Sequence, residues 1–393
     1  SENRITINPT ADLTGGEAQY FISYPSGAFT NNEGTAYVGT GYTFGTRAYA
    51  YQAWAMGKNN KGQLGLNDTN DRSSPTQIPG TTWTKVKGSL GTSAVHHAGI
   101  KSDGTLWLWG SNSYGQMGQN DRTERSSPVQ VPGTTWNNYS ASYCCSLASK
   151  TDGTLWAWGR GAYGELGLNS TTNYSSPVQI PGTNWNTSTI NIRSCTKTDG
   201  SLWTWGFNTW GQIGDNNRAS PGAISSPKQI PGSTWVEAAI AENTAIALKS
   251  DGTLWMWGYN SYGILNTSQT GSSGSRSSPV QIPGTNWDKI ATSNLANFAA
   301  VYAGQTDGSL YSWGHGAFNA LGQNSTSDIT NGPQQIGSDT TWDIIPIGGW
   351  ATQGAIKTDG TLWTWGVSGN GQTGQNNNTG YSSPKQVGSD TGY

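Results

Sequence analysis

The sequence predicts an all-β protein: a seven-bladed β-propeller of four-stranded antiparallel blades. Three short patterns predict it because they recur together along the chain: an Asp-Gly turn followed by a Trp-x-Trp strand, a glycine-rich loop, and a Ser-Pro-x-Gln-Ile segment. Recurrence at a spacing of roughly 20–50 residues is the mark of a repeat architecture. Closing such units into a ring leaves only short strand edges exposed, whereas an open array needs capping repeats. We therefore expect a closed ring.

The Trp strand is the most regular of the three patterns. Residues 103–110 read Asp-Gly-Thr-Leu-Trp-Leu-Trp-Gly, and successive copies that carry the aspartate lie 47 to 56 residues apart. A degenerate copy, residues 54–57, lies one repeat upstream and lacks the Asp-Gly. Asp-Gly between two apolar runs predicts a tight hairpin turn, because that turn needs residues that tolerate positive φ. The aspartates are Asp103, Asp152, Asp199, Asp251, Asp307 and Asp359.

The two tryptophans of this strand lie two positions apart, so both fall on one face. Leucines occupy the other face in residues 103–110, which means that the strand must be covered on both sides. Each tryptophan buries roughly 150–250 Å², and the chain has 20 of them. We expect the first tryptophan of the pair to be largely buried between blades in five units: Trp107, Trp156, Trp203, Trp255 and Trp363.

Residues 1–35 lie outside the repeat and are expected to form an N-terminal arm that docks a partner, or a strand that closes the ring. Short strands are predicted at residues 5–7 and 20–24, which are separated by glycine and proline breaks. The propeller is expected to span residues 36–393, and its irregular first unit has predicted strands at residues 37–38 and 47–51. The seven blades are expected near residues 36–81, 82–134, 135–183, 184–233, 234–285, 286–338 and 339–393.

Each regular unit begins with a short start that ends in tryptophan, continues through a second strand, the Asp-Gly turn and the Trp strand, and ends in the proline segment. Proline cannot donate a hydrogen bond to a ladder, so this last segment is predicted to be the outer, edge strand of its blade. Seven Trp strands accompany only six starts, at Trp83, Trp136, Trp185, Trp235, Trp287 and Trp342. An N-terminal strand is therefore expected to replace the missing start, which would bring the two termini close together.

The combination of Asp-Gly-x-Leu-Trp-x-Trp-Gly, Asn-x-x-Gly-Gln-Leu-Gly and Ser-Pro-x-Gln-Ile resembles the repeats of the regulator of chromosome condensation family, from about residue 54 to residue 387. The resemblance implies a seven-bladed propeller, of the kind also found in bacterial and phage proteins. It implies no single function, because one fold hosts many. Members include a guanine-nucleotide exchange factor on chromatin, a secreted β-lactamase inhibitor, and repeat proteins of bacteria and their viruses.

Two departures from the family pattern argue against nuclear exchange activity. Family repeats often carry Gly-x-x-His before the Asp-Gly turn, and here only His96 and His97 lie in such a place. The chromatin-bound member uses a basic N-terminal tail, whereas Arg4 is the only basic residue before Arg47.

Composition restricts the class of partner. Charged residues make up 11% of the chain and the formal net charge is -2, so no bulk attraction to nucleic acid or to an anionic membrane is expected. No apolar run is long enough to span a membrane, and no membrane insertion is expected. The three cysteines, Cys144, Cys145 and Cys195, indicate neither a disulfide framework nor a zinc site.

No residue pattern predicts catalysis, a metal site or a cofactor site, and we expect a protein that is not an enzyme. The repeated aspartates each precede glycine, which indicates a role in the turn. The acidic loops at residues 67–71 and 120–121 lack the glycine and glutamate spacing of an EF-hand calcium loop. His96, His97 and His315 show no metal-ligand spacing.

The most informative variation is at the fourth residue after the glycine that ends each Trp strand. Five of these seven residues are aromatic, within otherwise constant loops. By the symmetry of the repeat they form a ring at one level of the propeller. One interpretation is that each side chain covers a seam between blades, and the other is that they are exposed platforms for sugar or protein contact. This candidate contact ring consists of Lys61, Tyr114, Tyr163, Trp210, Tyr262, Phe318 and Asn370.

These observations lead to a functional hypothesis: a structural or host-recognition protein of a virus or phage particle, located on the virion surface. Near-zero charge and loops rich in Asn, Thr, Ser and Gly motivate it. The expected partners are other structural subunits, through the N-terminal arm, and a host-surface glycan or protein. The alternative is a secreted bacterial binding module or inhibitor.

Overall fold

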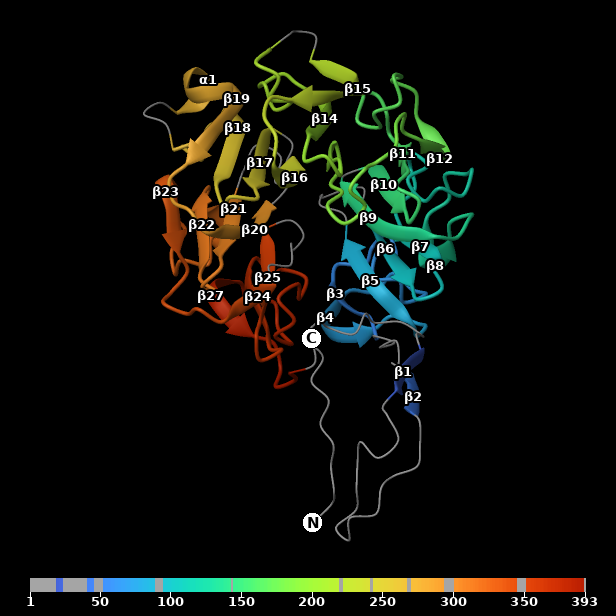
Figure 1. The fold of residues 1–393 in the computed structure, drawn as a ribbon. Coiled ribbons are helices and arrows are strands. Elements are labelled where there is room, and N and C mark those ends of the chain that lie inside the picture. The colour runs from blue at the N-terminus through green and yellow to red at the C-terminus, as the bar shows by residue number, and fades with distance from the viewer. Residues whose placement is uncertain are drawn as a thin grey trace, which may run out of the picture.

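The computed structural model describes residues 19–23, 41–45, 52–88, 95–142, 144–218, 222–240, 243–266, 270–292, 300–344 and 351–391. Figure 1 shows small antiparallel sheets that follow one another around a ring. Five of these sheets have four strands that lie side by side in chain order. Each such sheet is one blade of a β-propeller, so the predicted all-β fold class is confirmed.

The five four-stranded blades are built from strands of three to eight residues. The first two are β5 (Trp83–Gly88), β6 (His96–Lys101), β7 (Leu106–Gly110), β8 (Arg125–Gln130), and β9 (Trp136–Ser142), β10 (Cys145–Lys150), β11 (Leu155–Gly159), β12 (Tyr174–Gln179). The other three are β16 (Trp235–Ile240), β17 (Thr244–Lys249), β18 (Leu254–Asn260), β19 (Ser275–Ile282); β20 (Trp287–Thr292), β21 (Ala300–Gln305), β22 (Leu310–Gly314), β23 (Ile329–Gln335); and β24 (Trp342–Ile344), β25 (Thr352–Lys357), β26 (Leu362–Gly366), β27 (Tyr381–Gln386).

One further blade has three strands instead of four: β13 (Ser194–Thr196), β14 (Leu202–Phe207) and β15 (Ala223–Ile230). Trp185 makes only an isolated bridge to Lys197 where a first strand would pair. The side chain of Asn186 instead accepts hydrogen bonds from the backbone N–H and the hydroxyl of Ser188, at 3.2 and 2.6 Å. Such local side-chain bonds compete with strand pairing, which explains the missing strand.

The predicted number of seven four-stranded blades is wrong. The described residues form six blades, and the remaining place in the ring holds a two-stranded sheet of β3 (Trp54–Gly57) and β4 (Arg72–Gln77). The physical reason lies in the sequence, because this unit lacks both the Asp-Gly turn and the tryptophan-ended start. The strands predicted at residues 37–38 and 47–51 fall outside the described residues.

The Asp-Gly turns have the predicted role in the hairpin. The carboxylate of Asp103 accepts hydrogen bonds from the backbone N–H of Thr105 at 3.0 Å and from its hydroxyl at 2.6 Å. Gly104 has a φ of +75°, which a residue with a side chain adopts rarely. The Thr105 hydroxyl in turn accepts a hydrogen bond from Nε1 of Trp107 at 2.8 Å. The aspartate therefore stabilises the turn and, through threonine, the first tryptophan of the strand.

The first tryptophan of each pair, predicted to be largely buried, is partly buried and packs against the core, and the second is the fully buried one. Trp107 is only partly buried, whereas Trp109 is fully buried. The first tryptophan lies next to the surface turn and packs under a lysine, as Lys101 does with its Nζ 4.1 Å from the Trp107 ring centre. The second crosses the seam, as Trp109 does when its Nε1 donates to the carbonyl oxygen of Gln63 at 2.9 Å. Partial burial against the core is likewise found for Trp156, Trp203, Trp255 and Trp363.

A repeated backbone hydrogen bond joins neighbouring units. In the seam between the first two complete blades, the N–H of Asn120 donates to the carbonyl oxygen of Ser175 at 2.8 Å. The equivalent bond from Asn376 to Ser73, at 3.0 Å, joins the last blade to the sheet of β3 and β4. The ring is therefore closed through the two-stranded sheet. Prolines such as Pro128 lie in the outermost strand of each sheet of the ring, as predicted.

Two strands precede the ring. β1 (Gln19–Ser23) corresponds to the strand predicted at residues 20–24, and it pairs with β2 (Gly41–Gly45) to form an antiparallel hairpin. Figure 1 shows this hairpin outside the ring, below β4. The strand predicted at residues 5–7 and both termini lie outside the described residues, so their expected proximity stays a prediction. Within the described part of the chain, the only helices are α1 (Gly271–Gly274) and the 3-10 helix η1 (Ala317–Asn319), and neither could cross a membrane.

Candidate contact surface

In four of the seven units the loop that follows the Trp strand is held by an asparagine: Asn59, Asn112, Asn208 and Asn260. In the first complete blade the side-chain oxygen of Asn112 accepts a hydrogen bond from the N–H of Met117 at 2.9 Å. Its side-chain nitrogen donates to the carboxylate of Asp121, also at 2.9 Å. Asn112 is completely buried, so both ends of the loop are fixed to one rigid side chain.

A glycine brings the tip of this loop against the next blade. Gly115 has a φ of +83°, and a Cβ atom there would lie 2.6 Å from the Cα of Ser175 in β12. Only glycine fits this close approach. Tyr114 precedes this glycine, so its side chain is held over the seam.

The structure gives four of the aromatic residues in the predicted ring a side-chain partner from the next unit. Arg160 lies between two rings, 5.6 Å from the centre of Tyr114 and 4.9 Å from that of Tyr163. Tyr163 also meets Phe207 edge-on at 5.5 Å between ring centres. At the following seams Trp210 packs on Tyr259 at 4.3 Å, and Tyr262 packs on His315 at 4.2 Å.

Sequence reasoning missed these partners. Arg160, Phe207, Tyr259 and His315 each come directly after the glycine that ends a Trp strand. The residue at that position varies from unit to unit, and this variation could have indicated a functional role. Which ring residue it contacts, however, depends on how neighbouring blades pack against each other. We call the combined surface the aromatic belt: Tyr114, Arg160, Tyr163, Phe207, Trp210, Tyr259, Tyr262, His315 and Phe318.

The aromatic belt both covers seams and remains open to solvent. Tyr163 is 44% exposed and Phe318 is 41% exposed. Phe318 has a φ of 63°, a left-handed conformation that is unusual for an aromatic residue. His315 also lies 2.9 Å from a carboxylate oxygen of Asp328. Burial raises the pKa of Tyr262, and the nearby Asp328 carboxylate raises it further, so this phenol stays neutral.

The belt does not extend around the whole ring. Lys61 forms an ion pair with Glu124 of the next blade at 3.0 Å, with both side chains well exposed. The backbone N–H of Asn370 donates to the side chain of Gln372 at 2.7 Å. The predicted ring thus has an aromatic arc and a polar arc, and a partner would meet two different surfaces.

The described residues contain no cluster of three His, Cys, Asp or Glu side chains that could hold a metal ion. The three cysteines are free and buried, and burial raises the pKa of Cys144 and of Cys195 to about 12. His96 is also buried and lies 2.9 Å from the hydroxyl of Ser146. These groups are parts of the core.

The ring of blades and the constant loops define a repeat β-propeller, a class of binding modules. The chain belongs to the regulator of chromosome condensation (RCC1) repeat family. The model of this repeat matches residues 52–94, 103–145, 152–193 and 199–248, and a second model of the same description matches residues 242–264.

Sequence relatives match over single stretches. The Ultraviolet-B receptor UVR8 of Arabidopsis thaliana is 38% identical over 93 residues, which cover 24% of this chain and 20% of the receptor. The X-linked retinitis pigmentosa GTPase regulator of Mus musculus is 41% identical over 78 residues, 20% of this chain and 8% of that protein. The matched stretches thus span a fifth or less of these relatives.

Solved structures match over most of the ring. Prp20p of Saccharomyces cerevisiae superimposes with a TM-score of 0.72 and 16% identity, covering 87% of this chain and 88% of that one. Human WBSCR16 gives a TM-score of 0.71 and 17% identity, covering 86% and 94%. At these identities the likeness concerns the fold.

Proposed function

We propose that this protein is a non-enzymatic binding propeller that contacts a protein partner through the aromatic belt. The observation that carries the proposal is the series of partly exposed aromatic pairs, packed edge-on or tilted, over consecutive seams. Tyrosine, tryptophan and arginine are the residues enriched at protein interfaces, where their large faces lose little conformational freedom on binding.

The belt is suited to a flat and rigid contact. Tyr114, Tyr163, Trp210 and Tyr262 already rest on a neighbour from the next blade. Binding would not have to order these rings, so the entropic cost of association is reduced. The partners named for the yeast neighbours are proteins: Kap60 for one structure, and Gsp1p and histones for another. This favours a protein as the ligand class.

The test compares two triple variants in affinity purification from the source cells, with quantitative mass spectrometry. The belt variant carries Tyr163→Ala, Trp210→Ala and Phe318→Ala. The control carries Ser102→Ala, Thr151→Ala and Ser250→Ala, three exposed residues of the turns next to the Trp strands. We expect the control to retain the wild-type partner and the belt variant to lose it by at least about tenfold, since hot-spot truncations cost 2 kcal/mol or more. A belt variant that retains the partner contradicts the proposal.

The location of the protein is a separate proposal. Near-zero charge and polar, glycine-rich loops support the virion exterior, where the partner would be a host-surface molecule or a neighbouring subunit. The alternative is secretion by a bacterium. Mass spectrometry of purified particles and of the culture medium distinguishes the two, and absence of the protein from both contradicts both.

A further inference from the structure

Among the described residues, a lysine lies between two tryptophans in five of the blades. In the first complete blade, Nζ of Lys101 is 5.0 Å from the ring centre of Trp83 and 4.1 Å from that of Trp107. One ring belongs to the start of the blade and the other to the Trp strand. The other four lysines have Nζ 4.0–4.9 Å from the equivalent ring centres. We call each set a lysine clamp, and its lysines are Lys101, Lys150, Lys197, Lys249 and Lys357.

Most of these clamps hold an ammonium group that has no oxygen acceptor. Each clamp lysine is partly buried. An ammonium group carries three hydrogen-bond donors, and the faces of tryptophan rings attract its charge without replacing a carboxylate acceptor. Four of the clamp lysines have neither a hydrogen-bond acceptor nor an ion-pair partner within the described part of the chain: Lys101, Lys150, Lys197 and Lys249.

An exposed Pro-Gly turn leaves room beside three of these ammonium groups. The place that a Cβ atom would take at Gly133 is 3.8 Å from Nζ of Lys150 and 3.7 Å from Nε1 of Trp136. The same place at Gly182 and at Gly232 is 3.7–3.8 Å from the lysine Nζ and 3.4–3.7 Å from the tryptophan Nε1. These indole N–H groups are buried and have no hydrogen-bond partner among the described residues. Two donors therefore converge on one exposed position, and a negatively charged oxygen is the acceptor that fits them.

The fifth clamp shows which acceptor a clamp takes. Nζ of Lys357 donates a hydrogen bond to Oδ2 of Asp339. The other oxygen of Asp339 is fixed by the backbone N–H of Thr341 at 2.9 Å and by its hydroxyl at 2.6 Å. Residues 336–342 form a segment one residue longer than the corresponding residues 131–136, and this segment contains the aspartate. The chain thus fills one of its own clamps with a carboxylate.

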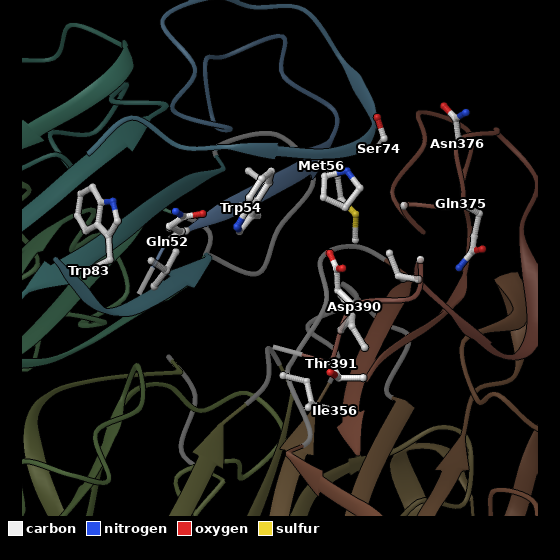
Figure 2. Close-up of a pocket in the computed structure, with 18 of the residues that line it drawn as sticks. Gln52, Trp54, Met56, Ser74, Trp83, Ile356, Gln375, Asn376, Asp390 and Thr391 are labelled. Carbon is white, nitrogen blue, oxygen red and sulfur yellow. The ribbon is translucent and has the colours of Figure 1, made fainter. Parts of the chain in front are cut away.

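The open clamps form an uninterrupted arc. In the next blade along the chain Gln305 replaces the lysine, and its side chain accepts a hydrogen bond from Tyr311 at 3.4 Å. At the two-stranded sheet, Trp54 lines a groove together with Asp390 (Figure 2). Residues 388–391 repeat the Gly-Ser-Asp-Thr sequence of the aspartate that fills the fifth clamp. The four open clamps therefore belong to consecutive blades, in the order Lys101, Lys150, Lys197 and Lys249.

We propose that this arc of four open lysine clamps binds an acidic segment of a protein partner, each ammonium group receiving one side-chain carboxylate. The turn aspartate beside each clamp, such as Asp103 beside Lys101, offsets its charge at a distance. Attraction is therefore restricted to a group that reaches the ammonium itself, as a flexible glutamate or aspartate side chain does. The turn at residues 102–105 precedes β7 and Tyr114 follows it, so this surface is separate from the aromatic belt and goes beyond the proposed function.

Binding of a fluorescein-labelled octaglutamate peptide, measured by fluorescence anisotropy, tests the proposal. The clamp variant carries glutamine, which the chain itself has at this position in Gln305, so the fold accepts it. Its changes are Lys150→Gln, Lys197→Gln and Lys249→Gln. The control removes the same charge at three exposed residues, through Lys58→Gln, Arg122→Gln and Lys385→Gln.

We expect wild type and control to bind the peptide alike and the clamp variant to bind it about tenfold more weakly, since each of three lost ion pairs contributes about twofold. A wild type that does not bind the peptide, or a clamp variant that matches the control, overturns the proposal. Labelled octathymidylate that binds the wild type as tightly and is lost in the clamp variant shows a phosphate site, which overturns the carboxylate assignment. Circular dichroism verifies that each variant is folded.

A titration of the unmodified chain with sodium acetate tests single clamps without any change in the fold. Lysine side-chain ¹H–¹⁵N spectra are recorded against sodium chloride at the same ionic strength. We expect the Nζ signals of the four open clamps to shift, and that of Lys357 to stay constant because Asp339 already fills its clamp. In the Asp339→Asn variant the Lys357 signal should shift with the others. A Lys357 signal that responds alike in both proteins overturns the proposal.

Discussion

Replacing Trp158 by alanine is expected to destabilise the propeller more than replacing Trp156, although both lie on β11. Trp158 is fully buried in the seam, and its Nε1 donates to the carbonyl oxygen of Gln116 in the preceding blade at 2.8 Å. Removing a buried tryptophan costs about 3–5 kcal/mol. Gln116 keeps a second hydrogen bond, from the hydroxyl of Ser146, so we expect no further large penalty from its carbonyl group.

Trp156 has weaker attachments. It is partly exposed, its Nε1 donates to the Thr154 hydroxyl at 2.9 Å, and Nζ of Lys150 lies 4.5 Å from its ring centre. An exposed cation–π contact contributes about 0.5–1 kcal/mol, and a hydrogen bond a similar amount. Together with the partial loss of apolar burial, these contributions lead us to expect that Trp156→Ala lowers the free energy of unfolding by about 2 kcal/mol.

Denaturant unfolding, followed by circular dichroism, measures the difference between the two variants. Comparison of the midpoints at a common slope gives the change in the free energy of unfolding. The two variants change the same type of residue, on the same strand, to alanine. They differ in how deeply the tryptophan is buried in the seam. A Trp156→Ala variant that loses as much stability as Trp158→Ala would refute the assignment of the core to the second tryptophan.

Three further outcomes are expected. Gly115→Ala should destabilise the fold by more than about 1 kcal/mol, because the residue has positive φ and the added Cβ would meet Ser175. Gly369→Ala is the control: no atom lies within 4 Å of its Cβ, so the unfolding midpoint should change little. Trp210→Ala should cost at least about 0.5–1.5 kcal/mol from loss of its pair with Tyr259, and Thr209→Ala on the same loop is the control. Hydrogen bonds from Thr154 lower the pKa of the Asp152 carboxyl from its ordinary value. A carboxyl with a lowered folded pKa contributes stability above its unfolded pKa and loses it as pH falls through the folded value. Asp152→Asn should therefore flatten the loss of stability below about pH 4, and an unchanged pH profile would contradict this role.

The repeat and its turns could be predicted because their causes are local. Asp152 and Gly153 determine a hairpin through their own backbone and side-chain bonds. The edge position of Pro177 follows in the same way from its missing N–H. These features need no knowledge of any other blade.

The errors arose where the outcome depends on distant residues. Alternation puts Trp156 and Trp158 on one face, but only the neighbouring loop at Gln116 decides which of them is buried. The partner of Tyr262 could not be predicted either, because His315 follows it by more than fifty residues and meets it only through the stacking of blades. The blade number differs from the prediction at the degenerate first unit, where, among the described residues, β3 pairs with β4 alone.

The bond that joins one unit to the next runs in a single direction. An asparagine at the end of each of six loops, such as Asn169, reaches forward to a serine at the start of the outer strand in the following unit, such as Ser225. Six of the seven joints therefore have the same two halves, an asparagine on one unit and a serine on the next. A gene duplication or deletion of a whole unit would leave compatible halves in contact, which makes the number of units an adjustable quantity in the evolution of such chains. The curvature that each seam imposes, and not any particular joint, then decides at which count the circle closes.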